Sequence, residues 1–377
     1  AADRCSWVVT SCCASAIALC PVLMNVMDTY VGQGASERQI AARRPIAVWL
    51  LCVAALVALI VVVGGATRLT DSGLSITEWK PVTGAIPPLS QEVWEEEFSK
   101  YQQIPEYIRI NRGMSLDEFK SIYWWEWGHR FLGRLIGLAF FVPFVIFVLT
   151  KRVERALLPH LGGMFVLGGM QGLLGWYMVM SGLTERVDVS QYRLAAHLGL
   201  AFFVFGYLVW AALPLWRRAL PQAPGFKGRE RQIVVLGGLI YLQIIAGAFV
   251  AGLDAGFTFN TWPLMDGDIF PRHLYPYSPF WVSLFEDVRT VQFNHRMLAY
   301  LIAVLVVVYW WRSRHDEGDL RRSGHLFLGA LCVQIVLGVV TLLSVVQIHV
   351  ALLHQLGAVM LLGAVLYHHD VERRAAV

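Results

Sequence analysis

The chain is poor in charged residues. Charged side chains make up 15% of its 377 residues and hydrophobic ones 56%, whereas about a quarter of the residues of a soluble globular domain are charged. This shortage excludes an ordinary water-soluble enzyme. The chain also lacks a Gly-x-Gly-x-x-Gly turn between a strand and a helix, so the sequence gives no sign of a bound dinucleotide that could supply electrons.

Cysteines are scarce where they could form disulfides. The six cysteines are Cys5, Cys12, Cys13, Cys20, Cys52 and Cys332. None falls in a segment that we assign below to the outer side of a membrane, so no disulfide is expected in an oxidising compartment. Four of them lie in residues 1–35, where residues 6–27 are apolar enough to suggest a ninth span or a signal, but Pro21 interrupts them and only Arg4 could form a basic start. We interpret residues 1–35 as a poorly ordered N-terminal extension.

Long apolar runs are abundant instead. Eight of them each reach roughly the 20 residues that an α-helix needs to cross a bilayer. They lie near residues 47–66, 131–149, 161–180, 194–214, 232–252, 293–311, 326–345 and 348–367. We therefore predict an all-α integral membrane protein with eight transmembrane helices in a lipid bilayer.

The distribution of Lys and Arg predicts the orientation. Seventeen of the 31 basic residues fall in five short segments, at 38–44, 151–155, 217–231, 312–322 and 373–374. Short loops rich in these residues stay on the cytoplasmic side. Both termini should therefore face the cytoplasm across a bacterial inner membrane, or the matrix across a mitochondrial one. This bias also explains the net charge of +4, so no nucleic-acid partner is expected.

The sequence contains an internal duplication. Residues 64–88 match residues 247–271 at an offset of 183, pairing Asp71 with Asp254, Gly73 with Gly256, Trp79 with Trp262, Gly84 with Gly267 and Pro88 with Pro271. The following helices match in the same order, which predicts a first half at 36–220 and a second at 221–377. Because each half has an even number of helices, both cross the membrane in the same sense. The expected fold is two four-helix bundles related by a pseudo-twofold axis.

Four of the eleven histidines occupy repeat-related positions near the outward helix ends, namely His129, His197, His295 and His354. Ionisable residues within a membrane span are costly and therefore indicate function. Zinc needs three or four converging ligands, whereas each half offers two, which suits the two axial positions of a haem iron between facing helices. We predict one haem-binding pair in each half. The other histidines, including His160, His368 and His369, are interpreted as solvated or interfacial.

Arginines and glycines accompany these histidines. Arg130, Arg134 and Arg296 lie beside them and are predicted to pair with haem propionates. Small residues on the same helices are expected to leave room for a flat macrocycle, at Gly133, Gly137, Gly199 and Gly357. A Gln-x-x-x-Gly spacing recurs at Gln171, Gln243 and Gln334, and we interpret it as helix packing with an interhelical hydrogen bond.

The two halves differ in one carboxylate. Glu126 precedes His129 by three residues and shares its helix face, whereas Gln292 stands at the equivalent place before His295. A carboxylate can relay protons or stabilise positive charge, which a neutral amide cannot do. The first half is therefore predicted to be the reactive one.

Together these residues resemble the haem A synthase family. The resemblance rests on specific motifs: Gly64-Gly65-Ala66-Thr67-Arg68-Leu69-Thr70-Asp71-Ser72-Gly73-Leu74-Ser75, Trp79-Lys80-Pro81, Glu126-Trp127-Gly128-His129-Arg130, Gln171-Gly172, Ala196-His197-Leu198, Asn260-Thr261-Trp262-Pro263, Phe293-Asn294-His295-Arg296 and His354-Gln355. The long first outward loop without a cysteine pair is similar to that of the alphaproteobacterial and mitochondrial branch.

The resemblance implies an enzyme that oxidises a ring methyl group of haem O to a formyl group, giving haem A for cytochrome oxidase. It implies that Glu126, His129 and His197 serve the substrate haem, and that His295 and His354 hold a haem b. It also implies an external electron donor, and haem O synthase and cytochrome oxidase assembly factors as partners.

Two other functions are compatible with the histidine pattern. A dihaem b-type membrane electron-transfer protein would use the same two pairs, but a pure electron carrier needs no carboxylate in one half only. A transporter whose histidines relay protons would also fit a pseudo-symmetric bundle. A haem analysis separates the three.

Overall fold

The computed structural model describes residues 35–184, 186–217 and 228–375, and the segment interpreted as an N-terminal extension lies almost wholly outside them. Within these ranges the chain forms helices and loops, without a β-strand. Eight helices are long and apolar enough to cross a membrane, which confirms the predicted number. They are α2 (Glu37–Leu69), α5 (Leu116–Leu149), α6 (Leu158–Met180), α7 (Gln191–Arg217), α8 (Arg229–Gly252), α10 (Val288–Ser313), α11 (Gly318–Leu343) and α12 (Ile348–Ala375).

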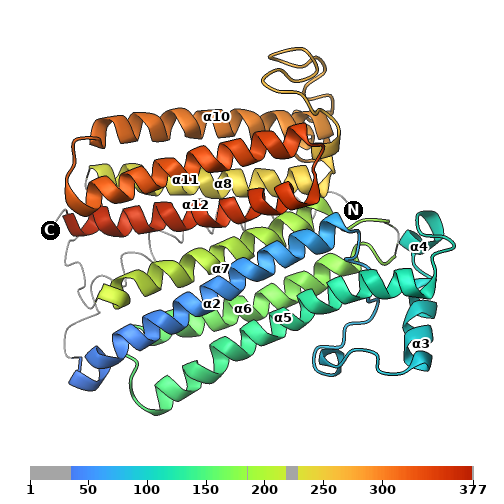
Figure 1. The fold of residues 1–377 in the computed structure, drawn as a ribbon, viewed down its shortest axis with the longest axis horizontal. Helices are drawn as coiled ribbons and strands as arrows, with labels where there is room; N and C mark the ends of the chain where they lie inside the picture. Colours follow the sequence, from blue (N-terminus) through green and yellow to red (C-terminus); the bar gives the residue numbers. More distant parts are fainter. Residues whose placement is uncertain (1–34, 185, 218–227, 376–377) are drawn as a thin grey trace.

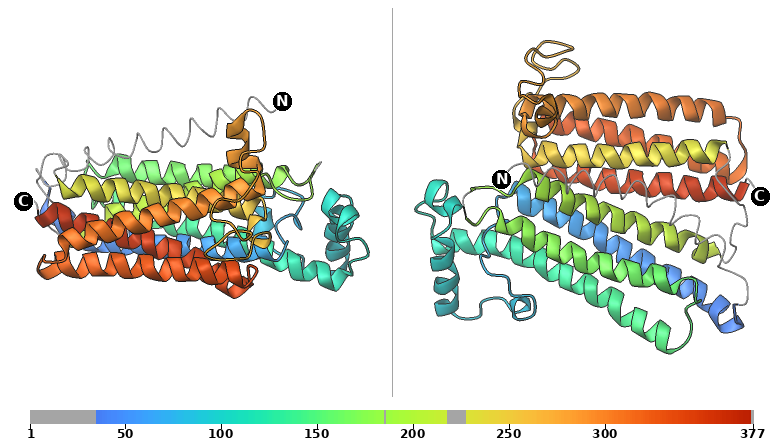
Figure 2. Two further views of the ribbon diagram at one scale, coloured as in Figure 1. Left: turned by 90° about the horizontal axis from the view of Figure 1, so that it is seen from above. Right: turned by 180° about the vertical axis from the view of Figure 1, so that it is seen from behind.

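The long helices form two groups of four. Figure 1 shows α2, α5, α6 and α7 side by side, and α8, α10, α11 and α12 beside them, and the view from behind in Figure 2 shows the same grouping. The groups meet where α2 and α7 pack against α8 and α12. In the 18-residue apolar window of α7, 61% of the residues are buried, against 6% in the corresponding windows of α5 and α6. The arrangement fits the predicted pair of four-helix bundles, with α5 and α6 on the outside of the first.

The helix ends follow from local sequence. Ser36 and Gln39 form a capping box at the start of α2, and Ser115 and Glu118 form one at the start of α5; each box pairs backbone N–H groups that the first helical turn leaves free. With 34 residues α5 is about 51 Å long, whereas the hydrocarbon core of a bilayer is about 30 Å thick. Several turns of α5 therefore extend beyond the membrane.

The long connections gather at one end of the bundle, which we call the loop-bearing end (Figure 1). Residues 70–115 include the short helices η1 (Thr83–Ala85), α3 (Gln91–Tyr101) and α4 (Pro105–Arg109), and residues 253–287 include η2 (Ala255–Phe257), η3 (Phe280–Val282) and α9 (Ser283–Glu286). The α3–α4 segment has a small core of its own, in which Trp94 packs against Phe119 and Tyr123 of α5. The projecting part of α5 thus supports this segment.

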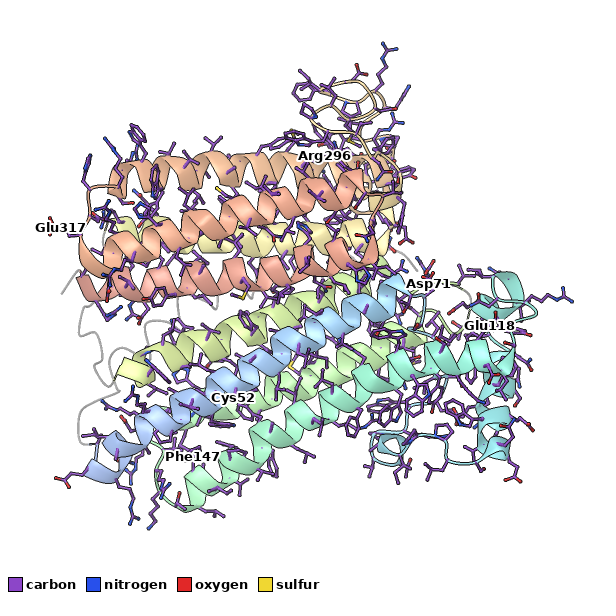
Figure 3. All side chains as sticks on the ribbon, in the orientation of Figure 1. Cys52, Asp71, Glu118, Phe147, Arg296 and Glu317 are labelled. Atoms are coloured by element: carbon purple, nitrogen blue, oxygen red, sulfur yellow. The ribbon has the colours of Figure 1, made fainter. Side chains whose placement is uncertain are left out.

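Ion pairs join elements at both ends. At the loop-bearing end, Arg68 of α2 binds both carboxylate oxygens of Asp254 at 2.8 Å and also contacts Asp71 at 3.2 Å, so it ties the first half to the second. Asp71 lies at this end of α2 in Figure 3. At the opposite end, the buried Arg43 pairs with Glu154 at 2.6 Å.

Candidate functional site

The structure brings the four predicted histidines together as two pairs, one in each half. His129 on α5 and His197 on α7 lie close enough for charges on their rings to interact, and so do His295 on α10 and His354 on α12. His197 and His354 are each the seventh residue of their helices, and His295 is the eighth of its helix. Both pairs therefore lie toward the loop-bearing end.

Each of these imidazoles rests on a glycine of a neighbouring helix. A Cβ atom added to the glycine would approach the histidine Cε1 to 2.8 Å at Gly64 and His129, 3.0 Å at Gly175 and His197, 3.1 Å at Gly247 and His295, and 2.9 Å at Gly338 and His354. Ordinary van der Waals contact begins near 3.4 Å. The same contact occurs four times, and only the lack of a side chain permits it.

These pairs fit a haem held by two axial ligands. Imidazoles from facing helices of a four-helix bundle can bind a haem iron, and each glycine admits the Cε1 edge of its ring close to the helix backbone. Among the described residues, the buried Nδ1 atoms of His129 and His354 have no hydrogen-bond partner. Within the same residues, no three His, Cys, Asp or Glu side chains gather as a metal cluster would require. Each half thus offers two imidazoles for one iron.

The glycines that matter here were missed by sequence reasoning. Gly175, Gly247 and Gly338 are the glycines of the Gln-x-x-x-Gly spacing, which we had interpreted as helix packing. Of the glycines predicted to make room, Gly199 faces Ile245 and Tyr241, and Gly357 faces Gln334. The recurrence of the spacing on three helices was the available signal. Its glutamines take part as well, because Gln171 Nε2 lies 3.2 Å from His197 Nδ1 and Gln243 Nε2 lies 3.1 Å from His295 Nδ1.

Helix α2 also touches the second half beside this site. Gly64 carries the ring of His129, and a Cβ on the next residue, Gly65, would overlap Oε1 of Gln355. Gln355 directly follows His354. Two adjacent glycines therefore contact the ligand region of both halves.

Repeat-related arginines hold the chain as it leaves the first helix of each half. Arg130 donates to the carbonyl oxygens of Ile76 (2.8 Å) and Glu78 (3.1 Å) in residues 75–81, which we call the first strap. Arg296 donates to those of Phe259 (2.6 Å) and Thr261 (2.8 Å) in residues 258–264, the second strap. Figure 3 shows Arg296 at the loop-bearing end of its bundle. Each strap is thereby fastened by the residue that directly follows a histidine.

Arg134 extends this pattern in the first half only. It donates through Nε to the Pro81 carbonyl at 2.9 Å and through Nη2 to the Lys80 carbonyl at 2.8 Å. Buried Nη1 of Arg134 and Nε of Arg296 have no hydrogen-bond partner among the described residues. The pairing of Arg130, Arg134 and Arg296 with propionates stays a prediction.

The carboxylate that distinguishes the halves lies at the junction of strap and helix. Glu126 is 3% exposed; its Oε1 accepts from Arg130 at 2.5 Å, and its Oε2 accepts from Ser75 Oγ at 2.8 Å and the Ile76 backbone N–H at 2.7 Å. At the equivalent place the amide of Gln292 donates to the Ala255 carbonyl at 2.9 Å and accepts from Arg296 at 3.2 Å. The two halves share the architecture, and the first adds a buried negative charge.

Three histidines that were predicted to be solvated or interfacial are buried instead. His160 bonds Tyr207 at 2.7 Å, and His368 lies between Tyr309 (2.9 Å) and Ser323 (2.8 Å). His369 approaches Glu230 at 3.5 Å. Their polar partners come from other helices, which a single sequence does not reveal.

Comparisons with known proteins decide the family. A family model described as cytochrome oxidase assembly protein matches residues 47–366. The heme A synthase of Parvibaculum lavamentivorans is 56% identical over 345 residues, which cover 92% of this chain and 98% of the relative. The heme A synthase of Nitrosospira multiformis is 48% identical over 356 residues, which cover 93% of this chain and 100% of the relative. The heme A synthase of Azorhizobium caulinodans is 51% identical over 346 residues, which cover 90% of this chain and 98% of the relative.

The chain belongs to the haem A synthase family. Both histidine pairs, their four glycines and both straps lie within the residues that the family model matches. Haem A synthases are matched over nearly their full length, which does not favour a dihaem electron carrier. Membership of the family and the eight apolar helices make this a multi-pass membrane protein.

Proposed function

We propose that this haem A synthase family member oxidises a ring methyl group of haem O to the formyl group of haem A, for use in cytochrome oxidase. The observation that carries the proposal is the Glu126 and Gln292 difference within an otherwise repeated site. A chain that only carried electrons between two haems would gain nothing from a buried carboxylate in one half.

In this proposal the first half holds the substrate and the second holds a resident haem b. His129 and His197 bind the haem whose methyl group reacts, and His295 and His354 bind the haem b. A haem bound at this site would supply the redox chemistry of two successive hydroxylations, each of which inserts one oxygen atom from an external oxidant with electrons from an external donor; loss of water from the doubly hydroxylated carbon leaves the formyl group. The residues of the chain fix the imidazoles against helix backbone, so that each ring has one orientation.

Glu126 is proposed to receive protons. A formyl group carries fewer hydrogens than a methyl group, so protons must leave the reacting carbon. Glu126 lies one turn before His129, and the Ser75 hydroxyl at 2.8 Å connects it to the strap. Arg130 donates to the other carboxylate oxygen at 2.5 Å. General bases of this kind typically contribute about 100-fold to 10,000-fold in rate.

The proposed location is a bacterial inner membrane, with the loop-bearing end outward and both termini in the cytoplasm. The basic segments at the opposite end support this orientation. The substrate is itself an apolar haem, so the proposed partners are the enzyme that makes haem O, an electron donor and the factors that assemble cytochrome oxidase.

Chromatography of haem extracted from the purified protein tests the proposal. We expect haem b together with haem O or haem A, and we expect His295→Ala or His354→Ala to lose haem b while the protein stays inserted. Haem b alone at both sites would indicate the dihaem electron carrier. A protein without haem would fit the proton-relaying transporter and overturn the proposal.

A further inference from the structure

The first strap crosses from one helix to another through a pair of tryptophans. Arg130 and Arg134 of α5 fasten the strap to that helix. Its Trp79 stacks on Trp176 of α6, with ring centroids 5.3 Å apart and planes at 28°. Trp176 directly follows Gly175, the glycine beneath His197. The stack therefore links α5 to α6 one residue from a proposed ligand contact.

The second strap does not make this crossing. Trp262, the repeat counterpart of Trp79, donates its Nε1–H to the hydroxyl of Tyr300 at 2.9 Å. Tyr300 is on α10, the helix whose Arg296 already fastens this strap. At the repeat position of Trp176 the second half has Val339. One half thus has a ring stack between two helices, and the other has a hydrogen bond to a single helix.

The seam that the tryptophans cross faces the surroundings of the protein. Only 6% of the residues in the 18-residue apolar windows of α5 and α6 are buried. Toward the opposite end, Phe165 of α6 packs on Phe141 and Phe140 of α5, at 5.3 and 6.4 Å between centroids. At the loop-bearing end the stack contributes a corresponding join, and Trp79 and Trp176 are 48% and 38% exposed. The stack can therefore part without moving the core.

We propose that haem O enters, and haem A leaves, laterally between α5 and α6, and that the Trp79–Trp176 stack closes this passage. The inference rests on the proposed function, because a substrate site must open in every turnover whereas a resident haem site need not. A haem with a long apolar chain partitions into lipid, so a passage on the lipid-facing side of the bundle meets it where it is concentrated. An aromatic stack closes the passage and opens at small cost, whereas the hydrogen bond of Trp262 fixes the second strap to one helix.

Haem release from protein in lipid nanodiscs tests the passage. Wild type and variants are loaded with haem O and mixed with excess apomyoglobin, which takes up released haem and changes the absorbance. Trp79→Ala and Trp176→Ala are expected to release haem O about 2- to 10-fold faster than wild type. The matched variant Trp262→Ala should release it at the wild-type rate, and Trp79→Phe, which keeps a ring for stacking, should fall near wild type.

Two controls separate the possible failures. Retained haem b in each variant shows that the protein has folded, so a changed release rate reports on the first half. If Trp79→Ala and Trp262→Ala both release haem O at the wild-type rate, the passage is wrong while the proposed function stands. If the exchangeable haem is lost in His295→Ala and kept in His129→Ala, the assignment of the halves in the proposed function is wrong.

Discussion

Replacing a glycine that contacts a histidine ring with alanine should weaken haem binding, because the added methyl group would displace the ring. In Gly247→Ala the new methyl group would lie 3.1 Å from His295 Cε1, inside the 3.4 Å at which ordinary contact begins. The ring must move by a few tenths of an ångström and turn away from the iron. Overpacking of this kind costs about 1–3 kcal/mol. If the cost falls on the liganded state, the affinity for haem b drops about 5- to 150-fold.

The same helix offers a matched control. Gly238 of α8 has no atom within 4 Å of an added Cβ, so Gly238→Ala introduces the same atom without the contact. Alanine favours a helix over glycine by about 1 kcal/mol, and this variant should keep all of its haem. The assay is haem b per polypeptide after purification, followed by titration of the stripped protein with haem and by the electron paramagnetic resonance of the ferric form.

These variants distinguish the role of His295 as a haem ligand from the role of Gly247 in positioning its ring. We expect Gly247→Ala to lose haem or to show altered ligand geometry, with Gly238→Ala unchanged. If Gly247→Ala binds haem with wild-type affinity and spectrum while His295→Ala loses it, the glycine does not position the ring and our reasoning from the contact is refuted.

Three further perturbations follow from the structure. Glu126→Gln should slow turnover about 100-fold or more while haem b is retained, and the ratio of haem O to haem A in membranes should rise. Gln292→Glu should leave that ratio unchanged. Equal ratios in wild type and Glu126→Gln would remove the carboxylate from the mechanism. Arg68→Gln removes the cation that binds Asp254 and should destabilise the protein by about 0.5–1 kcal/mol, measured as a lower thermal midpoint than that of wild type; an unchanged midpoint would contradict this. Burial raises the pKa of Glu106 to about 8 from its ordinary 4.5. The stability that protonated Glu106 gives to the α3–α4 segment should therefore be lost as pH rises from about 4.5 through 8. Hydrogen exchange of residues 91–111 should become faster over this range, and Glu106→Gln should remove the pH dependence.

The membrane spans could be predicted from sequence because their signal is local. Each apolar run marks the part of a helix that lies in lipid, and all eight runs fall on helices. The ends of the helices were harder to predict from sequence. The predicted run at 131–149 is the inner part of α5, which begins at Leu116 behind its capping box. Hydropathy does not report a helix that continues into water, and a cap motif is needed to find its start.

The site could be predicted in part for a related reason. The four histidines were found because repeat positions in one sequence can be compared directly. The glycines that contact them lie on other helices, and which helices are neighbours depends on tertiary packing. The sequence therefore predicted only glycines on the helices that carry the histidines. The arginines were assigned to propionates from charge alone, while the partners seen in the structure are backbone carbonyls of the straps. Backbone carbonyls are present at every residue and leave no mark in a sequence.

The pair of adjacent glycines on α2 has a consequence for how this protein can evolve. Gly64 touches His129 and Gly65 touches Gln355, which follows His354 in the other half. A side chain at residue 65 would therefore displace the end of the Gln355 side chain, 290 positions later in the chain. Although the halves are copies of one ancestor, they are not free to drift separately here. A substitution at residue 65 in the first half is therefore expected to reorient the Gln355 amide beside His354 in the second.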